Sequence, residues 1–337
     1  MPEFRQNRAT KEWIIIAKER AKRPDQFKLR RKKKKEFPPF DPGCPFCPGN
    51  ESKTPSEVFS LRKGKRWQVR VIPNKYPALA SEGQFLIQRE GFFIKARGIG
   101  HHEVIIHTPG HNRSLGSLAL SQVEKVCLTY RRRYLDLEKD KKIKLIIIFE
   151  NHGETAGTSL PHPHSQLVAL PLVPASIRHL LEEAMRYYDD HGCCVFCDMI
   201  SQELKTKKRV VARTEDFVAF HPFASRTPFE TWIVPLKHNA GFGSITESEC
   251  RKMAKILKAT LQMLDKSLSD PDYNLLIRTA PIKDAQEDYY HWHVQILPRL
   301  STPAGFELGS GVFINTTLPE ETAQFLRERK AKKGKPT

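Results

Sequence analysis

An internal repeat constrains the fold of this chain more than any other sequence feature. The segment His-Pro-His-Ser-Gln at 162–166 recurs as His-Trp-His-Val-Gln at 291–295, a shift of 129 residues (291 − 162). An earlier series of Glu, His, Asn, Gly and Ser that begins at Glu103 recurs without a gap from Glu230, a shift of 127 (230 − 103). Self-similarity at a fixed period indicates a repeated structural unit. We therefore expect the 337 residues to fold as two copies of one module.

Apolar patterning predicts strands on both sides of the loop that precedes the first histidine segment. Leu145–Phe149 is a continuous apolar run typical of a buried strand. Residues 162–169 alternate, so an extended chain would direct His162, His164 and Gln166 to one face. Because proline has no N–H to donate to a ladder, Pro163 indicates the start of a strand or an edge strand. Two imidazoles and an amide would then share a surface that a ligand can approach.

Each copy also contains a predicted helix. One begins at Ser121, and the other follows Thr246, which forms a capping-box pattern with Glu249. The order within a copy is strands, a cysteine turn, a strand ending in histidine, a helix and two more strands, which predicts an α+β fold. We expect two modules, residues 1–175 and 176–337, each an antiparallel sheet with packed helices.

Cysteine spacing predicts metal sites rather than disulfides. Four of the seven cysteines form two Cys-x-x-Cys pairs, without the pattern of a secreted disulfide framework. A thioredoxin-like pair would open a helix after a strand, whereas residues 42–49 are a turn rich in Pro and Gly. Two cysteines and two histidines make a closed tetrahedral set for structural zinc; the alternative is free thiols and scattered histidines. We expect one Zn²⁺ per module, held by Cys44, Cys47, His111 and His162 and by Cys194, Cys197, His238 and His291.

Charge and hydropathy weigh against some classes of protein. The net charge of +18 would suit nucleic acid or phosphorylated small molecules, but much of it lies in the run Arg30–Lys35 and in a tail from Arg327 to Lys335. Because no aromatic stacking motif accompanies these runs, nucleic-acid binding is the weaker interpretation. No stretch approaches the roughly 20 apolar residues of a membrane span, and no signal-peptide pattern begins the chain. We expect a cytoplasmic protein without a membrane partner.

If His162 binds metal, His164 remains as a second imidazole on the same face. A neutral imidazole attacks phosphorus without prior deprotonation, and the phosphoramidate formed can pass its group onward. The loop Gly153–Ser159 offers backbone N–H groups and a hydroxyl to phosphate oxygens, and Gln166 offers an amide. These residues predict nucleotidyl or phosphoryl transfer through a covalent histidine, without identifying the base or the sugar.

These motifs resemble the active-site signature of the galactose-1-phosphate uridylyltransferase family, in the histidine-triad superfamily. The resemblance rests on Glu-Asn-His-Gly at 150–153 and on Ala-Gly-Thr-Ser-Leu-Pro-His-Pro-His-Ser-Gln at 156–166, and it covers nearly the whole chain. Residues 13–24 are similar to the family's phosphate-contacting segment, 73–78 to its nucleoside-contacting segment and 306–315 to its sugar-phosphate segment. The resemblance implies duplicated histidine-triad-like modules and a homodimer.

The resemblance further implies a ping-pong transfer of UMP from UDP-glucose to galactose 1-phosphate, a step of galactose metabolism. His164 would be the nucleophile, and Gln166 and Ser159 would contact the transferred phosphoryl group. The family's metal positions fall on the first Cys and His set. The second module is expected to keep the fold and lose the chemistry, so His293 would not be a second nucleophile. The substrate-binding positions carried over are Arg20, Arg23, Asn74, Asn151, Gly157, Thr158, Phe306, Glu307, Gly309 and Ser310.

Departures from the family pattern leave the substrates open. Lys75 stands where well-studied members have an acidic residue for the ribose hydroxyls, and Ser310 and Gly311 stand where they have Tyr and Glu near the hexose. Ser165 in place of Gly, and the second cysteine pair, also resemble the ADP-glucose phosphorylase branch, which transfers AMP to inorganic phosphate. We expect a hexose-1-phosphate uridylyltransferase. The alternatives are the adenylyl-transferring phosphorylase and a non-catalytic, zinc-stabilised protein that binds nucleotides or nucleic acid.

Overall fold

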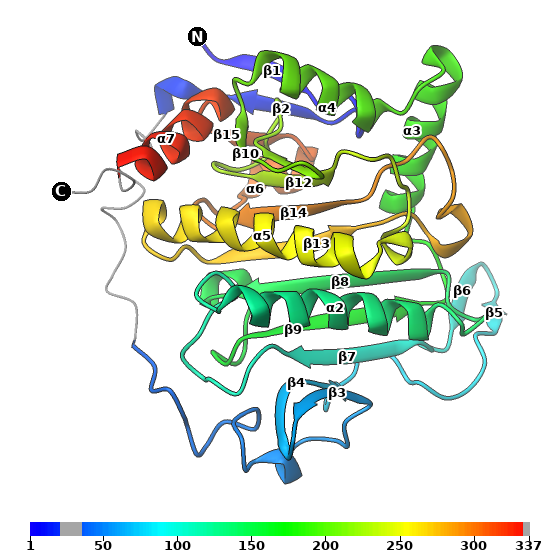
Figure 1. Ribbon diagram of the computed structural model, residues 1–337. Helices are drawn as coiled ribbons and strands as arrows, with labels where there is room; N and C mark the ends of the chain where they lie inside the picture. Colours follow the sequence, from blue (N-terminus) through cyan, green and yellow to red (C-terminus); the bar gives the residue numbers. More distant parts are fainter. Residues whose placement is uncertain (21–35, 333–337) are drawn as a thin grey trace.

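Apolar and alternating segments pair into a ten-stranded antiparallel sheet in the computed structural model, which describes residues 1–20 and 36–332 (Figure 1). Arg23 and the basic run 30–35 lie outside the described residues. In spatial order the strands are β10 (Val210–Arg213), β11 (Phe217–Phe220), β12 (Thr231–Pro235), β14 (His293–Pro298), β13 (Tyr273–Arg278), β8 (Leu145–His152), β9 (His164–Leu170), β7 (His101–Ile106), β4 (Arg66–Pro73) and β3 (Phe59–Lys63).

The sheet consists of two halves with the same strand order, which confirms the predicted duplication. The series β3-β4-β7-β9-β8 runs inward from one edge, and β10-β11-β12-β14-β13 runs inward from the other. The halves join where β8 pairs with β13, with Ile148 opposite Ile277. Each half-sheet is antiparallel as expected, and their pairing satisfies backbone groups that two exposed edges would leave unbonded. The predicted strand at Leu145–Phe149 is therefore central, and β9 begins directly after Pro163.

Two long helices cover one face of the sheet and lie side by side (Figure 1). Helix α2 (Leu120–Leu137) begins one residue before the predicted Ser121, and α5 (Glu247–Leu268) has the predicted capping box of Thr246 and Glu249. Burying each large aliphatic side chain between helices and strands stabilises the fold by about 1.5–3 kcal/mol. This core includes Val126, Ile148, Leu167, Leu257, Leu261, Leu264 and Ile277.

Shorter elements surround the sheet. A three-stranded sheet combines β1 (Glu3–Gln6) and β2 (Trp13–Ile16) with β15 (Phe313–Asn315), so N-terminal strands pair with the end of the second half. The module boundary at 175/176 stays a prediction. No helix in the described ranges is long and apolar enough to cross a membrane. A projecting hairpin consists of β5 (Ile87–Glu90) and β6 (Phe93–Ala96) (Figure 1). The other helices are α3 (Ala175–His191), α4 (Val195–Thr206), α6 (Gly305–Ser310) and α7 (Pro319–Lys332). The 3₁₀ turns are η1 (Lys18–Arg20), η2 (Glu51–Lys53), η3 (Glu154–Ala156), η4 (Phe242–Ser244) and η5 (Ile282–Asp284).

The loop between β8 and β9 is held by residues of the other half of the sheet. Gly153 has φ +86° and ψ 161°, a conformation that residues with a side chain rarely adopt. Asp272, just before β13, accepts hydrogen bonds from the N–H (2.9 Å) and the hydroxyl (2.6 Å) of Thr155. The Asn274 amide donates to the Asn151 side-chain oxygen and to a loop carbonyl, both at 2.9 Å. The second half thus fixes the loop that precedes the histidine pair of the first.

Replacing Gly153 by alanine should destabilise the protein, because the added Cβ would lie 2.2 Å from the Asp272 carboxylate carbon. We expect Gly153→Ala to lower the free energy of unfolding by about 2–4 kcal/mol, measured by urea denaturation. Gly64→Ala is the matched control, because Gly64 also has a positive φ (+60°) but no atom lies within 4 Å of its added Cβ. The control should lose about 1 kcal/mol. Equal losses would contradict the close fit of the loop against Asp272.

Candidate active site

Two cysteines and two histidines from distant segments meet beside the first half-sheet. Cys44 and Cys47 come from a turn, His111 follows β7, and His162 lies just before β9; all four are buried. Cys47 Sγ lies 3.5 Å from His111 Nδ1 and 3.7 Å from His162 Nδ1, and Cys44 Sγ lies 3.8 Å from His162 Nδ1. Metal bonds of about 2.3 Å to sulfur and about 2.0 Å to nitrogen in a tetrahedral site would place sulfur and nitrogen about 3.5 Å apart. The set therefore fits a metal ion.

The tautomer and neutral charge of His162 favour metal binding at this first cluster. His162 Nε2–H donates to the Thr108 carbonyl at 2.8 Å, which leaves Nδ1 unprotonated beside the sulfurs. Burial lowers the pKa of His162 to about 4, so its imidazole is neutral at pH 7. Burial raises the pKa of the Cys44 thiol to about 11, and a bound cation would release that proton.

A second Cys₂His₂ cluster lies in the other half, as the repeat predicts. Cys194 precedes α4, Cys197 lies in its first turn, and His238 and His291 come from loops next to β12 and β14. Cys197 Sγ lies 3.3 Å from His238 Nδ1 and 3.5 Å from His291 Nδ1. In both clusters the ligand atoms all lie within 4.8 Å of one another. The described part of the chain thus contains two sets that could hold a metal ion.

His164 begins β9 with one ring nitrogen held and the other without a hydrogen-bond partner in the described part of the chain. Its Nδ1–H donates to the His162 carbonyl at 2.8 Å, so the lone pair of the neutral ring lies on Nε2. Phe46, from the cysteine turn, packs edge-on against the ring, with centroids 5.3 Å apart. Burial lowers the pKa of His164, which keeps the ring uncharged at neutral pH. A neutral imidazole with a fixed tautomer is suited to attack phosphorus.

Gln166 shares the face of His164, as the alternation predicted. The ladder with β7 directs both side chains away from α2, whereas Leu167 lies in the core beneath that helix. Gln166 Oε1 is 2.8 Å from His102 Nε2, and the Asn74 amide nitrogen is 3.1 Å from the same atom. Sequence reasoning named Gln166 and Asn74 but missed His102 between them. His102 could be recognised as a neighbour of Gln166 only after the pairing of β7 with β9 was known.

The loop before His164 presents fewer free N–H groups than its glycines suggested. The N–H groups of residues 155–158 all donate within the protein, three to carbonyls of the loop and one to Asp272. Ser159 is exposed, and its N–H and hydroxyl have no partner among the described residues. Ser159 is therefore the loop residue best placed to donate to a phosphate oxygen, while Gly157 and Thr158 complete the turn that leads to it.

Ser165 faces the core beneath His164 in a buried hydrogen-bonded group. Its Oγ lies 2.7 Å from His107 Nε2 and also bonds to the Tyr130 hydroxyl of α2. Glu150 lies opposite Ser165 in the ladder with β8, and burial raises its pKa to about 7. Because these groups lie on the helix side of the sheet, they anchor β9 and do not face a substrate.

The second histidine pair lies in a filled site. His293 is 3% exposed and stacks on Trp232, with ring centroids 4.4 Å apart. Burial lowers the pKa of His293 to about 3. The Gln295 amide donates to Glu230 at 2.8 Å, and its oxygen accepts from Arg278 at 2.9 Å. The covered ring and the fully used amide favour the expectation that His293 is not a second nucleophile.

Several residues implied by the resemblance are not joined to His164. In the ranges that the structure describes, no hydrogen bond or ring contact connects α6 with β9; this helix packs beside β15. Arg20 ends η1, but its side chain and the whole of Arg23 lie outside the description. Lys75 is exposed next to Asn74. The residues implied by the resemblance that lie on α6 are Phe306, Glu307, Gly309 and Ser310.

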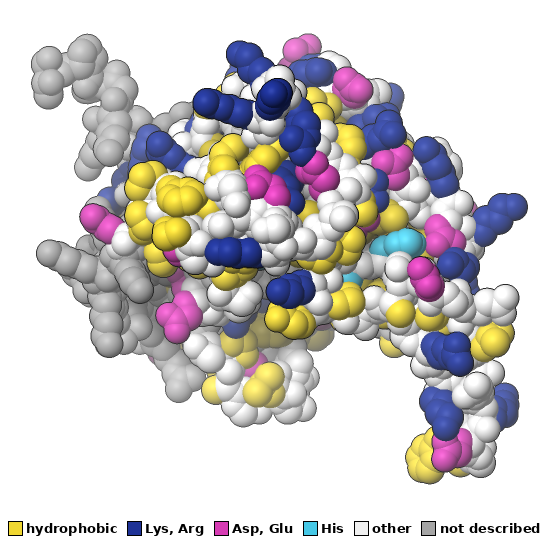
Figure 2. Space-filling model, turned by 90° about the horizontal axis from the view of Figure 1, so that it is seen from below, with side chains coloured by type: hydrophobic (Ala, Val, Ile, Leu, Met, Phe, Trp, Pro, Cys, Tyr) yellow, Lys and Arg dark blue, Asp and Glu magenta, His cyan; other side chains and the backbone are white. Residues whose placement is uncertain are grey.

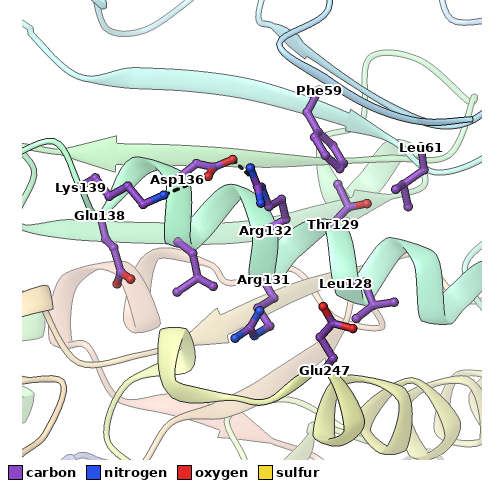
Figure 3. Close-up of a pocket in the computed structure, with 11 residues that line it drawn as sticks. Phe59, Leu61, Leu128, Thr129, Arg131, Arg132, Asp136, Glu138, Lys139 and Glu247 are labelled. Carbon is purple, nitrogen blue, oxygen red and sulfur yellow. Dashed lines mark hydrogen bonds and ion pairs between the residues drawn. The ribbon is translucent and has the colours of Figure 1, made fainter.

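Other surface features contain none of the predicted site residues. A cavity of about 480 Å³ lies on the helix side of the sheet, between β3, α2 and the start of α5 (Figure 3). Phe59 and Leu61 form its apolar wall, and Arg132 and Lys139 both pair with Asp136 at its rim. On the face shown in Figure 2, Lys and Arg side chains are scattered among acidic ones instead of forming one patch. The histidine face of β9 remains the candidate site.

Comparison with known proteins identifies the family. The models for the N-terminal and C-terminal domains of galactose-1-phosphate uridyl transferase match residues 1–174 and 181–331. ADP-glucose phosphorylase of Arabidopsis thaliana is 36% identical over 97% of this chain and 93% of its own. Galactose-1-phosphate uridylyltransferase of Thermotoga maritima is 32% identical over 97% of this chain and 98% of its own.

Two solved structures resemble the fold of this chain over nearly its whole length. The structure of an Arabidopsis thaliana ADP-glucose phosphorylase with bound ADP-glucose has a TM-score of 0.81 and 32% identity, over 97% of this chain and 99% of that one. A structure described as uridylyltransferase has a TM-score of 0.76 and 28% identity, over 99% and 100%. Since the two domain models together match most of its length, the protein belongs to the galactose-1-phosphate uridyl transferase family, as its motifs indicated.

Proposed function

We propose that the protein is a nucleotidyltransferase that moves UMP from UDP-glucose to a hexose 1-phosphate, with galactose 1-phosphate as the expected acceptor. The observation that carries the proposal is the fixed tautomer of His164, whose Nδ1–H is held by the His162 carbonyl while Nε2 has no hydrogen-bond partner among the described residues. Family membership and the 32% identical uridylyltransferase of Thermotoga maritima support it.

The reaction proceeds in two displacements at one phosphorus. His164 Nε2 attacks the uridylyl phosphorus of UDP-glucose; the N–P bond forms, the P–O bond breaks, and glucose 1-phosphate leaves with the electron pair. A phosphate oxygen of the acceptor then attacks the same phosphorus and the N–P bond breaks. The Gln166 amide and Ser159 donate to the phosphoryl oxygens as charge develops. The bond from Nδ1–H to the His162 carbonyl stabilises the positive ring formed in each step.

Substrate contacts are proposed on the same face and in the segments carried over from the family. Asn151 lies on β8 and accepts from Asn274, whereas Gly157 and Thr158 lie in the loop after that strand. Asn74 lies next to the His102 nitrogen that also contacts Gln166. Arg20, Arg23 and the four α6 residues are proposed from the family resemblance alone. A homodimer is proposed on the same ground, and light scattering would test it.

We further propose that each Cys₂His₂ cluster holds one Zn²⁺. Thiolate and imidazole ligands suit zinc, and a closed set of four ligands indicates a structural role. The first ion would fix the turn that carries Phe46 against the His164 ring. A cytoplasmic location fits such free thiolates, because reducing conditions prevent disulfides.

A second candidate function is the transfer of AMP from ADP-glucose to inorganic phosphate by the same histidine. It is favoured by the 36% identity to an ADP-glucose phosphorylase and by the similar structure in which ADP-glucose is bound. Lys75, which stands in place of an acidic residue beside Asn74, also suggests a different nucleoside contact.

A substrate comparison separates the two candidates. Protein incubated with UDP-glucose alone should release glucose 1-phosphate in an amount equal to the enzyme, because the histidine retains UMP. Added galactose 1-phosphate should then yield UDP-galactose with turnover, resolved by anion-exchange chromatography. The parallel incubation contains ADP-glucose with and without inorganic phosphate. Turnover only of ADP-glucose with phosphate would establish the second candidate, and no transfer from either nucleotide sugar would leave a binding protein.

Substitution of the two neighbouring histidines should separate nucleophile from ligand. His164→Gly should keep the metal content and melting temperature but lose more than about 10³-fold in activity, and added imidazole should restore part of the transfer. His162→Gly should lose the first ion and become less stable, with activity reduced as a secondary effect. Radioactive phosphorus from the nucleotide sugar should label the wild type and His162→Gly through an acid-labile, base-stable bond. Full labelling of His164→Gly would place the nucleotide on another residue.

Metal analysis should find about two zinc ions per chain, one for each cluster. Cys44→Ser and Cys194→Ser should each lose one ion and lower the melting temperature, because the ligands join distant segments. Cys44→Ser should also lower activity more, since its cluster adjoins His164. Cys193→Ser is the matched control, because this thiol lies next to Cys194 but outside both sets. A zinc-free wild type, or a melting temperature that chelation leaves unchanged, would refute the structural role.

A further inference from the structure

The side-chain oxygen of Gln166 is held by a histidine outside the His-Pro-His segment. His102 lies on β7 opposite Val168 of β9, on the same face as Gln166. Its Nδ1 accepts a hydrogen bond from the Ala78 backbone N–H at 3.2 Å. A ring nitrogen that accepts carries no proton, so the proton of the neutral ring is on Nε2.

This tautomer determines the orientation of the Gln166 amide. His102 Nε2–H can only donate, so the Gln166 atom 2.8 Å away is the acceptor oxygen. The Ala78 backbone N–H fixes the tautomer of His102. The Gln166 oxygen is therefore assigned without relying on the shape of the amide, in which oxygen and nitrogen look alike. The Gln166 NH₂ group then points away from His102, and it has no acceptor among the described residues. The Asn74 oxygen accepts from the Tyr76 N–H at 2.9 Å, so its amide nitrogen, 3.1 Å from His102 Nε2, faces a second donor and makes no hydrogen bond with it in this tautomer.

In the second half of the sheet the equivalent amide, that of Gln295, makes hydrogen bonds through both its oxygen and its NH₂ group. The Gln295 oxygen accepts from Arg278 at 2.9 Å, and its NH₂ group donates to Glu230 at 2.8 Å. In the first half the oxygen is also held, but no carboxylate of the described residues takes the NH₂ group. Glu103 lies opposite Leu167 in the ladder as Thr231 lies opposite Ile296, so His102 stands at the place of Glu230. Glu103 itself faces the helix side and pairs with Arg133 through bonds of 2.6 and 2.8 Å. The amide of the first half is thus oriented at one end and free at the other.

We propose that His102 is a positioning residue for nucleotidyl transfer, which holds the Gln166 oxygen so that the NH₂ group faces the phosphoryl group on His164. The inference rests on the proposed function. Without this donor the amide could turn its oxygen toward the negatively charged phosphoryl oxygens, where it would repel them. Because charge on those oxygens increases in the transition state, the loss should fall on kcat more than on KM.

His102→Phe tests the inference, because it keeps a flat ring of similar size and removes both nitrogens. We expect kcat to fall about ten-fold with KM within about two-fold of the wild type. His101→Phe is the matched control: this neighbour points to the other face, where its ring lies 3.2 Å from Asp140, and kcat should be unchanged. In a Gln166→Met background, His102→Phe should have no further effect, since the amide through which it acts is gone.

An unchanged kcat in His102→Phe, or an equal loss in the Gln166→Met background, would overturn the inference. If His102→Phe does not fold, nitrogen NMR of histidine-labelled wild-type protein provides the test. A protonated Nε2 and a bare Nδ1 on His102 support the inference, and the opposite tautomer refutes it. Wild-type protein that transfers no nucleotide would refute the proposed function and the inference together, whereas normal wild-type transfer with an unaffected His102→Phe would refute the inference alone.

Discussion

The hydrogen bond from His164 Nδ1–H to the His162 carbonyl determines what this site can do chemically. It places the lone pair on Nε2 and orients the ring at the start of β9. His162 has two roles at once, because its side chain belongs to the first Cys₂His₂ cluster while its carbonyl holds the neighbouring ring. The turn that supplies the two cysteines of this cluster also carries Phe46, which packs against His164. The proposed metal site, the start of β9 and the orientation of the proposed nucleophile therefore depend on one short segment.

Duplication provides this segment with a rigid support. The second half repeats the strand order and the Cys₂His₂ set, but Trp232 covers its histidine and Arg278 and Glu230 use its amide. Its remaining contribution to the site comes from the start of β13, where Asp272, just before the strand, and Asn274 hold the loop that precedes β9. The second half thus positions the proposed active site of the first, across a sheet whose halves share a continuous ladder.

The features that sequence reasoning predicted are those set by local pattern or by ligand chemistry. Alternation placed Gln166 and Leu167 on opposite faces, the capping box located the start of α5, and residue type and repeated order identified both Cys₂His₂ sets. What it missed depends on contacts between distant segments. Nothing near Thr155 in the chain indicates that Asp272 takes its N–H group, so the loop amides looked free. His102 likewise gains its role only from the pairing of β7 with β9.

The central claim is that the nucleotide is carried on Nε2 of His164 while Nδ1 keeps its proton for the His162 carbonyl. The most direct test is phosphorus–nitrogen coupling in the NMR spectrum of nitrogen-labelled protein trapped with a nucleotide sugar and no acceptor. The account predicts one phosphorus coupled to Nε2 of His164, with a protonated Nδ1 on the same ring. Phosphorus on Nδ1, on the nitrogen of another histidine or on no nitrogen at all would contradict it.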